Sequence, residues 1–167
     1  KNYELFIKIS KYLSLKNKNF KFVLIGDSMN NLNIELINQL KKNDILDKFY
    51  LLGEQKNINQ YYNILDFYIH TSKTEGFSNA IAESMASSVI TFGTDAGDTR
   101  KILSGDYFLI NEKNYKDAAE KIFKISKMKK KKINILRNNM RKKIMENFDI
   151  ENIKKLYQKI YFSTKSV

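Results

Sequence analysis

The chain has 167 residues, 43% of them hydrophobic, which predicts a single domain with a substantial core and excludes wholesale disorder. It contains no cysteine and one histidine, His70, so disulfides, thiol nucleophiles and metal sites built from several histidines are excluded. The net charge of +12 is typical of proteins that bind nucleic acid or anionic membranes. However, only three of the basic residues are arginine, and no nucleic-acid-binding motif occurs. A compositional bias towards Lys, Asn and Ile therefore explains the charge better, and no nucleic-acid partner is expected.

In chain order, helix-period segments alternate with short apolar runs up to residue 112. The first two helices carry apolar stripes, formed by Leu5, Ile9, Tyr12 and Leu13 and by Leu32, Leu36, Ile37 and Leu40. The runs are continuous and rich in β-branched and aromatic residues, which predicts strands buried on both faces. We expect strands at 22–26, 49–53, 67–71, 89–93 and 107–110, and helices at 3–17, 31–43, 57–65, 79–88 and 98–104. This alternation predicts an α/β fold with a doubly wound, Rossmann-like parallel sheet and helices on both faces.

The strand pattern stops after residue 112, and a helical C-terminal tail follows. Helices are expected at 114–128, 130–146 and 150–162, the last with Ile150, Ile153, Tyr157 and Ile160 on one stripe. Five lysines lie between Lys127 and Lys132, which indicates a solvated junction between helices, with membrane contact as the alternative. No apolar run approaches the ~20 residues of a membrane span, and no signal peptide opens the chain.

Polar loops follow three of the predicted strands, and in a parallel α/β sheet ligands bind beyond the carboxyl ends of the strands. These loops cover residues 26–28, 53–55 and 72–79. The third runs into a helix whose start is marked by Ser78 and Asn79, where free amides suit a phosphate and Gly76 allows close approach of the backbone. Glu75 and Glu83 suit hydrogen bonds from hydroxyl groups, as on a sugar or a ribose.

The segment EGFSNAIAESMA, from Glu75 to Ala86, closely resembles the Glu-x7-Glu segment of the retaining glycosyltransferases of family 4, which have the GT-B fold. Further similarity lies in the loop 94–100 and at the strand ends 24–27, 51–53 and 66–69, so the resemblance covers most of residues 1–145. The chain departs from the family pattern where Ser88 and Ile90 stand in place of Gly and Pro, and where Thr71-Ser72 stands in place of Pro-Ser.

The resemblance implies that residues 1–146 form a nucleotide-sugar-binding domain and that residues 147–167 form a helix that packs back on an N-terminal domain. Lys1 matches a family Lys that opens the first helix, so the first strand, its Arg and the acceptor-binding domain are expected upstream. That strand would lie between the first and third strands of this chain, with the second at one edge of the sheet and the fifth at the other. Because only the donor-binding part is present, the chain alone is expected to transfer no sugar.

By the same resemblance, the intact enzyme moves a sugar from a nucleoside-diphosphate donor, with UDP as the expected nucleotide, and retains the anomeric configuration. Glu75 is the expected catalytic residue, which orients the transferred sugar, and Glu83 is expected to bind the ribose. Lys1 would contact phosphate, and the backbone near Gly53 and Gln55 would meet the base. The diphosphate or sugar would meet the backbone amides of Gly76, Phe77, Ser78 and Asn79. No cofactor and no metal is expected, because cations and helix amides neutralise the leaving diphosphate.

His70 follows a buried strand and is expected to be structural rather than catalytic. The implied acceptor is a glycan or a lipid-linked sugar, in bacterial cell-surface polysaccharide or glycan synthesis. A cytoplasmic location is expected, with peripheral association at the inner face of the plasma membrane. The alternatives left open are a nucleotide-sugar epimerase, a non-catalytic nucleotide-sugar-binding module of the same fold and a lysine-rich RNA-binding protein.

Overall fold

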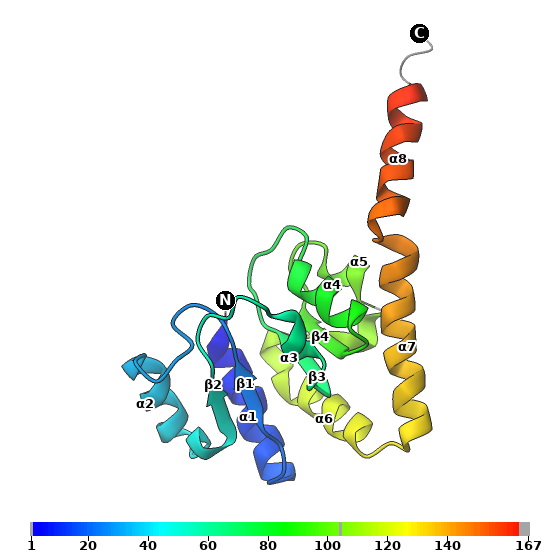
Figure 1. Cartoon of the computed structure of the whole chain (residues 1–167). Helices are drawn as coiled ribbons and strands as arrows, with labels where there is room; N and C mark the ends of the chain where they lie inside the picture. The colour runs from blue at the N-terminus through cyan, green and yellow to red at the C-terminus, as the bar shows by residue number, and fades with distance from the viewer. Residues whose placement is uncertain (1, 104, 164–167) are drawn as a thin grey trace.

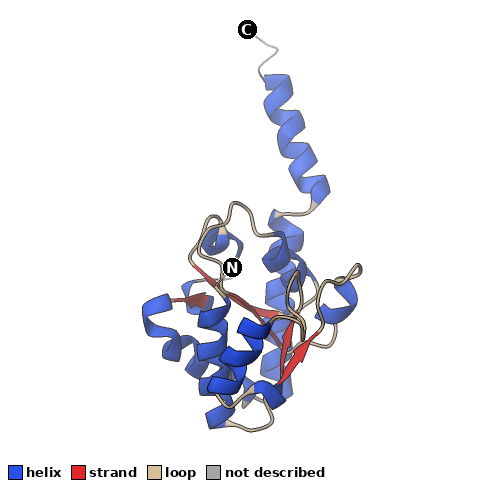
Figure 2. Cartoon of the chain, turned by 90° about the vertical axis from the view of Figure 1, so that its left-hand side faces the viewer, coloured by secondary structure: helices blue, strands red, loops and turns tan. Residues whose placement is uncertain are grey.

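The computed structural model describes residues 2–103 and 105–163 (Figure 1). In this part of the chain the strands are β1 (Phe22–Leu24), β2 (Phe49–Leu51), β3 (Phe67–His70), β4 (Ile90–Thr94) and β5 (Leu109–Ile110). All pairings are parallel: β1 pairs with β2, and β4 pairs with both β3 and β5. Helices lie on both sides of the strands (Figure 2). The predicted Rossmann-like α/β fold is therefore confirmed.

The helices begin and end close to their predicted positions. They are α1 (Tyr3–Lys16), α2 (Ile34–Lys42), α3 (Asn59–Tyr62), α4 (Asn79–Ala86), α5 (Thr99–Ile102), α6 (Tyr115–Ser126), α7 (Lys130–Asn147) and α8 (Ile150–Ser163). Two asparagines cap the first two: the side-chain oxygen of Asn2 accepts from the Leu5 N–H at 3.2 Å, and that of Asn33 from the Leu36 N–H at 3.0 Å. These caps satisfy backbone donors that a helix start leaves unpaired.

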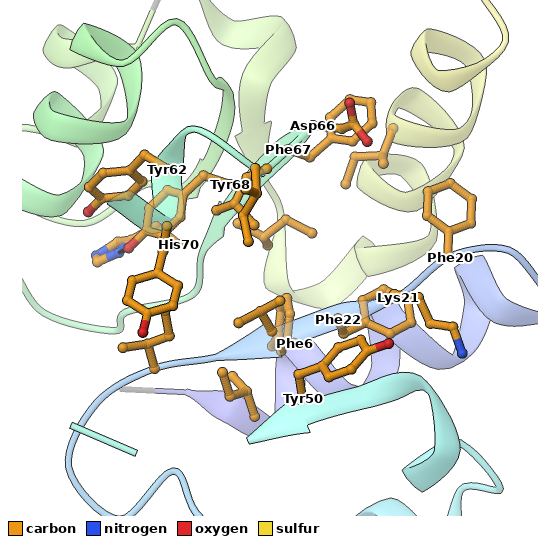
Figure 3. A pocket seen from close by; sticks show the side chains of 18 of the residues that line it. Phe6, Phe20, Lys21, Phe22, Tyr50, Tyr62, Asp66, Phe67, Tyr68 and His70 are labelled. Carbon is orange, nitrogen blue, oxygen red and sulfur yellow. Dashed lines mark hydrogen bonds between the residues drawn. The ribbon is translucent and has the colours of Figure 1, made fainter. Parts of the chain in front are cut away.

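The strands form two sheets rather than one continuous sheet. Between residues 2 and 163, leaving aside 104, no strand pairing joins β1 to β3, and a cavity of about 1020 Å³ lies between them. Phe6 and Phe22 line one wall of this cavity, and Phe67 and Tyr68 line the other (Figure 3). The outer strands are β2 and β5. The gap thus lies at the place that the sequence analysis gives to a further central strand.

The sheet of β3, β4 and β5 carries the larger core. β4 is buried along its whole length, α4 and α7 pack against it, and α1 packs against α6. A smaller cluster involves α1 and α2, and its buried members are Ile7, Leu36, Leu40 and Ile45. Ile9 of α1 belongs to the larger cluster and Ile7 to the smaller one, so α1 joins the two halves of the molecule.

Three expectations about local structure are corrected. Leu32 is 87% exposed and precedes α2, because the Asn33 cap starts that helix at Ile34. Tyr107 and Phe108 lie in a short 3-10 helix (Asp106–Phe108), so the last strand is shorter than predicted, although Phe108 still packs its ring against Phe92. Most residues of β1, β2 and β3 are only partly buried, because β1 and β3 border the cavity and Tyr50 of β2 faces solvent; Phe22 and His70 are buried as predicted.

α8 extends away from the rest of the molecule (Figures 1 and 2). Three of the four residues on its predicted stripe are exposed, namely Ile150, Tyr157 and Ile160, whereas Ile153 is partly buried. That this helix packs back on an N-terminal domain stays a prediction. Among the helices described, none is long and apolar enough to cross a membrane.

Candidate functional site

The loop between β3 and α4 is held in place by a second loop, the one that follows β4. Gly97 has a φ of +55°, and a Cβ at this position would lie 2.2 Å from the carbonyl oxygen of Glu75. The N–H of Asp98 donates to the carbonyl of Gly76 at 3.0 Å. Only glycine allows two backbones to approach this closely in the left-handed region. Gly97 therefore fixes the position of the Glu75–Gly76 backbone.

The first turn of α4 presents its backbone donors at the end of this loop. The helix begins at Asn79 with Ser78 as its N-cap, as predicted from these two residues. The Ser78 side chain makes no capping hydrogen bond; its Oγ instead lies 3.4 Å from Nε2 of His70. The first N–H groups of a helix have no partner within the helix, and they carry the positive end of its dipole. This start of α4 can therefore bind an anion such as a phosphate.

Glu75 lies beside a buried histidine at the end of β3. Its Oε1 is 3.0 Å from Nε2 of His70, and the Glu75 side chain is 19% exposed while His70 is 3% exposed. On the other side of the imidazole, the Tyr68 hydroxyl lies 3.3 Å from Nδ1. Burial raises the pKa of Tyr68 above its ordinary value, so the phenol stays protonated. His70 is thus buried and hydrogen-bonded, as expected of a structural histidine, and it contacts a predicted site residue.

Glu83 lies about one turn inside α4 and is exposed at the surface. The Tyr62 hydroxyl lies 3.3 Å from its Oε2, and burial, followed by the charge of Glu83, raises the pKa of Tyr62. The Tyr62 ring packs edge-on against the ring of Tyr68, with centroids 5.8 Å apart. Through these two tyrosines, the surroundings of Glu83 are continuous with those of His70 and Glu75. The structure therefore brings the two predicted glutamates into one polar cluster.

Phe77 and Asn79 complete the predicted set at this loop. Both are exposed, and the ring of Phe77 packs against that of Phe148, at the junction of α7 and α8, with centroids 5.4 Å apart. The Phe77 ring remains 42% exposed, and contact of the backbone amides of residues 76–79 with a ligand stays a prediction.

The loop after β2 contains Gly53 and Gln55, and its polar groups contact one another. The Gly53 N–H donates to the carbonyl of Met29 at 2.8 Å, and the Gly53 carbonyl accepts from the Gly26 N–H at 2.9 Å. Nε2 of Gln55 donates to the carbonyl of Leu52 at 2.6 Å, and the Tyr61 hydroxyl donates to its Oε1 at 2.8 Å. Their contact with a base stays a prediction.

Lys1, the remaining predicted phosphate contact, lies outside the described residues. Within the described ranges there is no group of three or more His, Asp or Glu side chains that could hold a metal ion. The large cavity lies between β1 and β3 and borders the predicted site, because Tyr62, Tyr68 and His70 line it.

Three contacts of the site were not predicted: Tyr62 with Glu83, His70 with Glu75, and Gly97 with the Glu75 loop. A sequence signal was present for the contact of His70 with Glu75. Residues two apart in a strand lie on the same face, so Tyr68 and His70 share a face, and the loop that follows them contains the Glu75 carboxylate. The Tyr62–Glu83 and Gly97–Glu75 contacts join separate segments of the chain, and no local pattern indicates them.

A family model described as "Glycosyl transferases group 1" matches residues 1–146. N-acetylgalactosamine-N,N'-diacetylbacillosaminyl-diphospho-undecaprenol 4-alpha-N-acetylgalactosaminyltransferase of Campylobacter jejuni is 34% identical over 106 residues, which is 64% of this chain and 28% of that protein. The lipopolysaccharide core biosynthesis mannosyltransferase LpsB of Rhizobium meliloti is 31% identical over 71 residues, which is 42% of this chain and 20% of that protein.

The fold is also shared with a mutant of S. aureus TarM, solved in complex with Fondaparinux, alpha-GlcNAc-glycerol and UDP. The TM-score is 0.82 at 19% sequence identity, and the match covers 96% of this chain and 33% of that one. The matched part of the chain therefore spans a third or less of the length of each of these proteins.

Proposed function

Because the chain belongs to the glycosyl transferases group 1 family, we propose that it is the donor-binding part of a retaining, family 4 glycosyltransferase. The family match and the shared fold support a GT-B glycosyltransferase domain. The donor we propose is a UDP-sugar, since TarM was solved with UDP. The acceptor we propose is a glycan or a lipid-linked sugar, used in bacterial cell-surface synthesis at the cytoplasmic face of the membrane. The names of the two relatives support this proposal, because one refers to a diphospho-undecaprenol-linked sugar and the other to the lipopolysaccharide core.

One observation carries the proposal: two carboxylates flank the amide-bearing start of α4. The diphosphate would meet the amides of residues 76–79, where the dipole of α4 favours negative charge. Glu83 would accept hydrogen bonds from the ribose hydroxyls, and Glu75 would accept them from the hydroxyls of the transferred sugar.

In the transfer step, the bond between the anomeric carbon and the diphosphate breaks, and negative charge grows on the leaving oxygen. Preorganised amides that face this charge stabilise the transition state more than the ground state. This assignment needs neither a metal nor a cofactor. The acceptor would be bound by another part of the enzyme, so we expect the purified 167-residue chain to transfer no sugar.

Calorimetric titration of the 167-residue chain with UDP, GDP and ADP tests the proposal. We expect saturable binding of UDP at physiological salt. Glu83→Ala should weaken UDP binding about 10- to 150-fold, because a hydroxyl loses a charged acceptor. Glu35→Ala, which removes an exposed glutamate from the first turn of α2, is the matched control and should bind UDP like the parent.

Absence of nucleotide binding, or equal affinities of the parent and Glu83→Ala, would contradict the assignment of this site. Steep salt dependence of affinity for RNA, together with absent UDP binding, would instead favour a nucleic-acid partner.

A further inference from the structure

We propose that His70 is a positioning residue for Glu75: its Nε2–H holds the carboxylate in the orientation that meets the donor sugar, and Tyr68 fixes the imidazole tautomer that makes this possible. This inference rests on the proposed function, because it concerns the side chain that we assign to the sugar.

The hydrogen-bond partners determine the tautomer. A carboxylate only accepts hydrogen bonds, so the 3.0 Å contact from His70 Nε2 to Glu75 Oε1 requires the proton on Nε2. In a neutral ring Nδ1 then carries no proton, and the Tyr68 hydroxyl, 3.3 Å away, can donate to it. A neutral imidazole with the proton on Nε2 satisfies both neighbours.

Three consecutive elements of the chain, β3, the loop after it and the start of α4, meet at this imidazole. Tyr68 and His70 come from β3, Glu75 comes from the loop, and Ser78 from the start of α4 brings its Oγ to 3.4 Å from the same Nε2. Figure 3 shows the rings of Tyr68 and His70 side by side, with Tyr62 next to them. The carboxylate and the first turn of α4 are therefore tied to the same buried ring.

This arrangement suits a positioning role. Glu75 lies in a loop next to the exposed Gly76, and a glutamate there has many rotamers to choose from unless a partner selects one. A buried ring at the end of a strand is a rigid partner, and binding is tighter when the contacting group is already oriented. His70 would thus act on the sugar through Glu75, without touching the nucleotide.

The chain has one histidine, so its imidazole gives the only histidine signals in a nitrogen-15 long-range NMR spectrum. At neutral pH we expect the pattern of a neutral ring protonated on Nε2. Tyr68→Phe should raise the share of the other tautomer, and Glu75→Gln should shift the Nε2 signal. A ring protonated on Nδ1, or one unchanged in both variants, would overturn the proposal.

The second measurement is calorimetry with UDP, UDP-glucose and UDP-N-acetylglucosamine. His70→Leu fills the buried position with an apolar side chain and removes the hydrogen-bond donor. His70→Gln supplies an amide N–H donor that can still reach Glu75. For a UDP-sugar that the parent binds, we expect His70→Leu to lower its affinity relative to UDP about five- to tenfold, and His70→Gln to recover most of that loss.

Each failure has a distinct reading. If the parent binds none of the three ligands, the proposed function itself is wrong, and the positioning role is wrong with it. If the parent binds them and His70→Leu shows the parental ratio of UDP-sugar to UDP affinity, only the role of His70 is wrong. A His70→Leu chain that does not fold leaves the test to Tyr68→Phe, for which an unchanged ratio and an unchanged tautomer would overturn the proposal.

Discussion

The loop after β3 and the loop after β2 have similar compositions but differ in what their polar groups contact. In the first, the side chains of Glu75 and Ser78 converge on His70, and the start of α4 offers backbone donors. In the second, the backbone of Gly53 and the side chain of Gln55 are hydrogen-bonded within the chain. The comparison teaches that residue types alone do not show which polar groups of a loop are already hydrogen-bonded within the chain.

The two loops also stand on different cores. The loop after β3 follows a sheet whose central strand β4 is wholly buried, whereas the loop after β2 follows a two-stranded sheet over a small cluster. A smaller core contributes less hydrophobic stabilisation. We therefore expect the loop after β2 to depend more on internal hydrogen bonds for its stability. Three predictions test this contrast, and a fourth tests the joint between the two halves.

The largest expected effect is on Gly97, which supports the loop after β3. Gly97→Ala should lower the free energy of unfolding by about 2–4 kcal/mol, because the new Cβ meets the Glu75 carbonyl and the backbone has a positive φ. Urea unfolding measures it. Gly76→Ala is the matched control: nothing lies within 4 Å of its Cβ, so we expect a change below about 0.5 kcal/mol. Equal stability of the two variants would show that the loops are not fixed against each other.

Glu75→Ala separates the sugar from the nucleotide. We expect UDP to bind nearly as to the parent, while the affinity for a UDP-sugar falls about tenfold, because only the sugar hydroxyls lose a charged acceptor. Calorimetry with the ligands named above measures both. Glu83→Ala should weaken UDP and UDP-sugar together. If Glu75→Ala and Glu83→Ala lose equal affinity for UDP, the roles of the two glutamates are assigned wrongly.

Gln55→Ala tests the internal bonding of the loop after β2. We expect the free energy of unfolding to fall by about 1 kcal/mol, since the Leu52 carbonyl and the Tyr61 hydroxyl lose their partner. Tyr61→Phe should cost a similar amount. Because both changes break the same bond, the double variant should be less destabilised than the sum of the two. Strict additivity in urea unfolding would argue that Gln55 and Tyr61 act independently.

The smallest expected effect lies at the joint between the halves, where α1 meets α6. Hydrogen bonds from Lys16 and Tyr12 lower the pKa of Glu120. A lowered pKa stabilises the fold above the ordinary pKa of the carboxyl, and that contribution is lost as the pH falls through the folded value. The urea midpoint of Glu120→Gln should therefore approach that of the parent as the pH drops below about 4.5. A constant difference between pH 3 and pH 7 would contradict this.

Periodicity and cap residues were enough to predict the alternating elements and the start of α4 at Ser78 and Asn79. They failed where tertiary contacts decide the outcome. Leu32 continues the stripe of α2 in the sequence, but the Asn33 cap leaves it outside the helix. Phe108 belongs to an apolar run that is typical of a strand, yet its backbone forms a short 3-10 helix. The contact of Glu75 with Gly97 depends on how the loops after β3 and β4 come together, which a local pattern does not encode.

The gap between β1 and β3 has a consequence for motion. A continuous sheet would lock the two loops to each other through hydrogen bonds, whereas here α1 links the two halves by side-chain packing. Packed helices slide by small shear movements more readily than paired strands do. In the 167-residue chain, whose gap is the place expected for a further central strand, we expect the spacing between the loop after β2 and the start of α4 to fluctuate, and a ligand that touches both would act as a clamp. Bound UDP should slow amide hydrogen exchange in β1 and β3, far beyond the residues it touches.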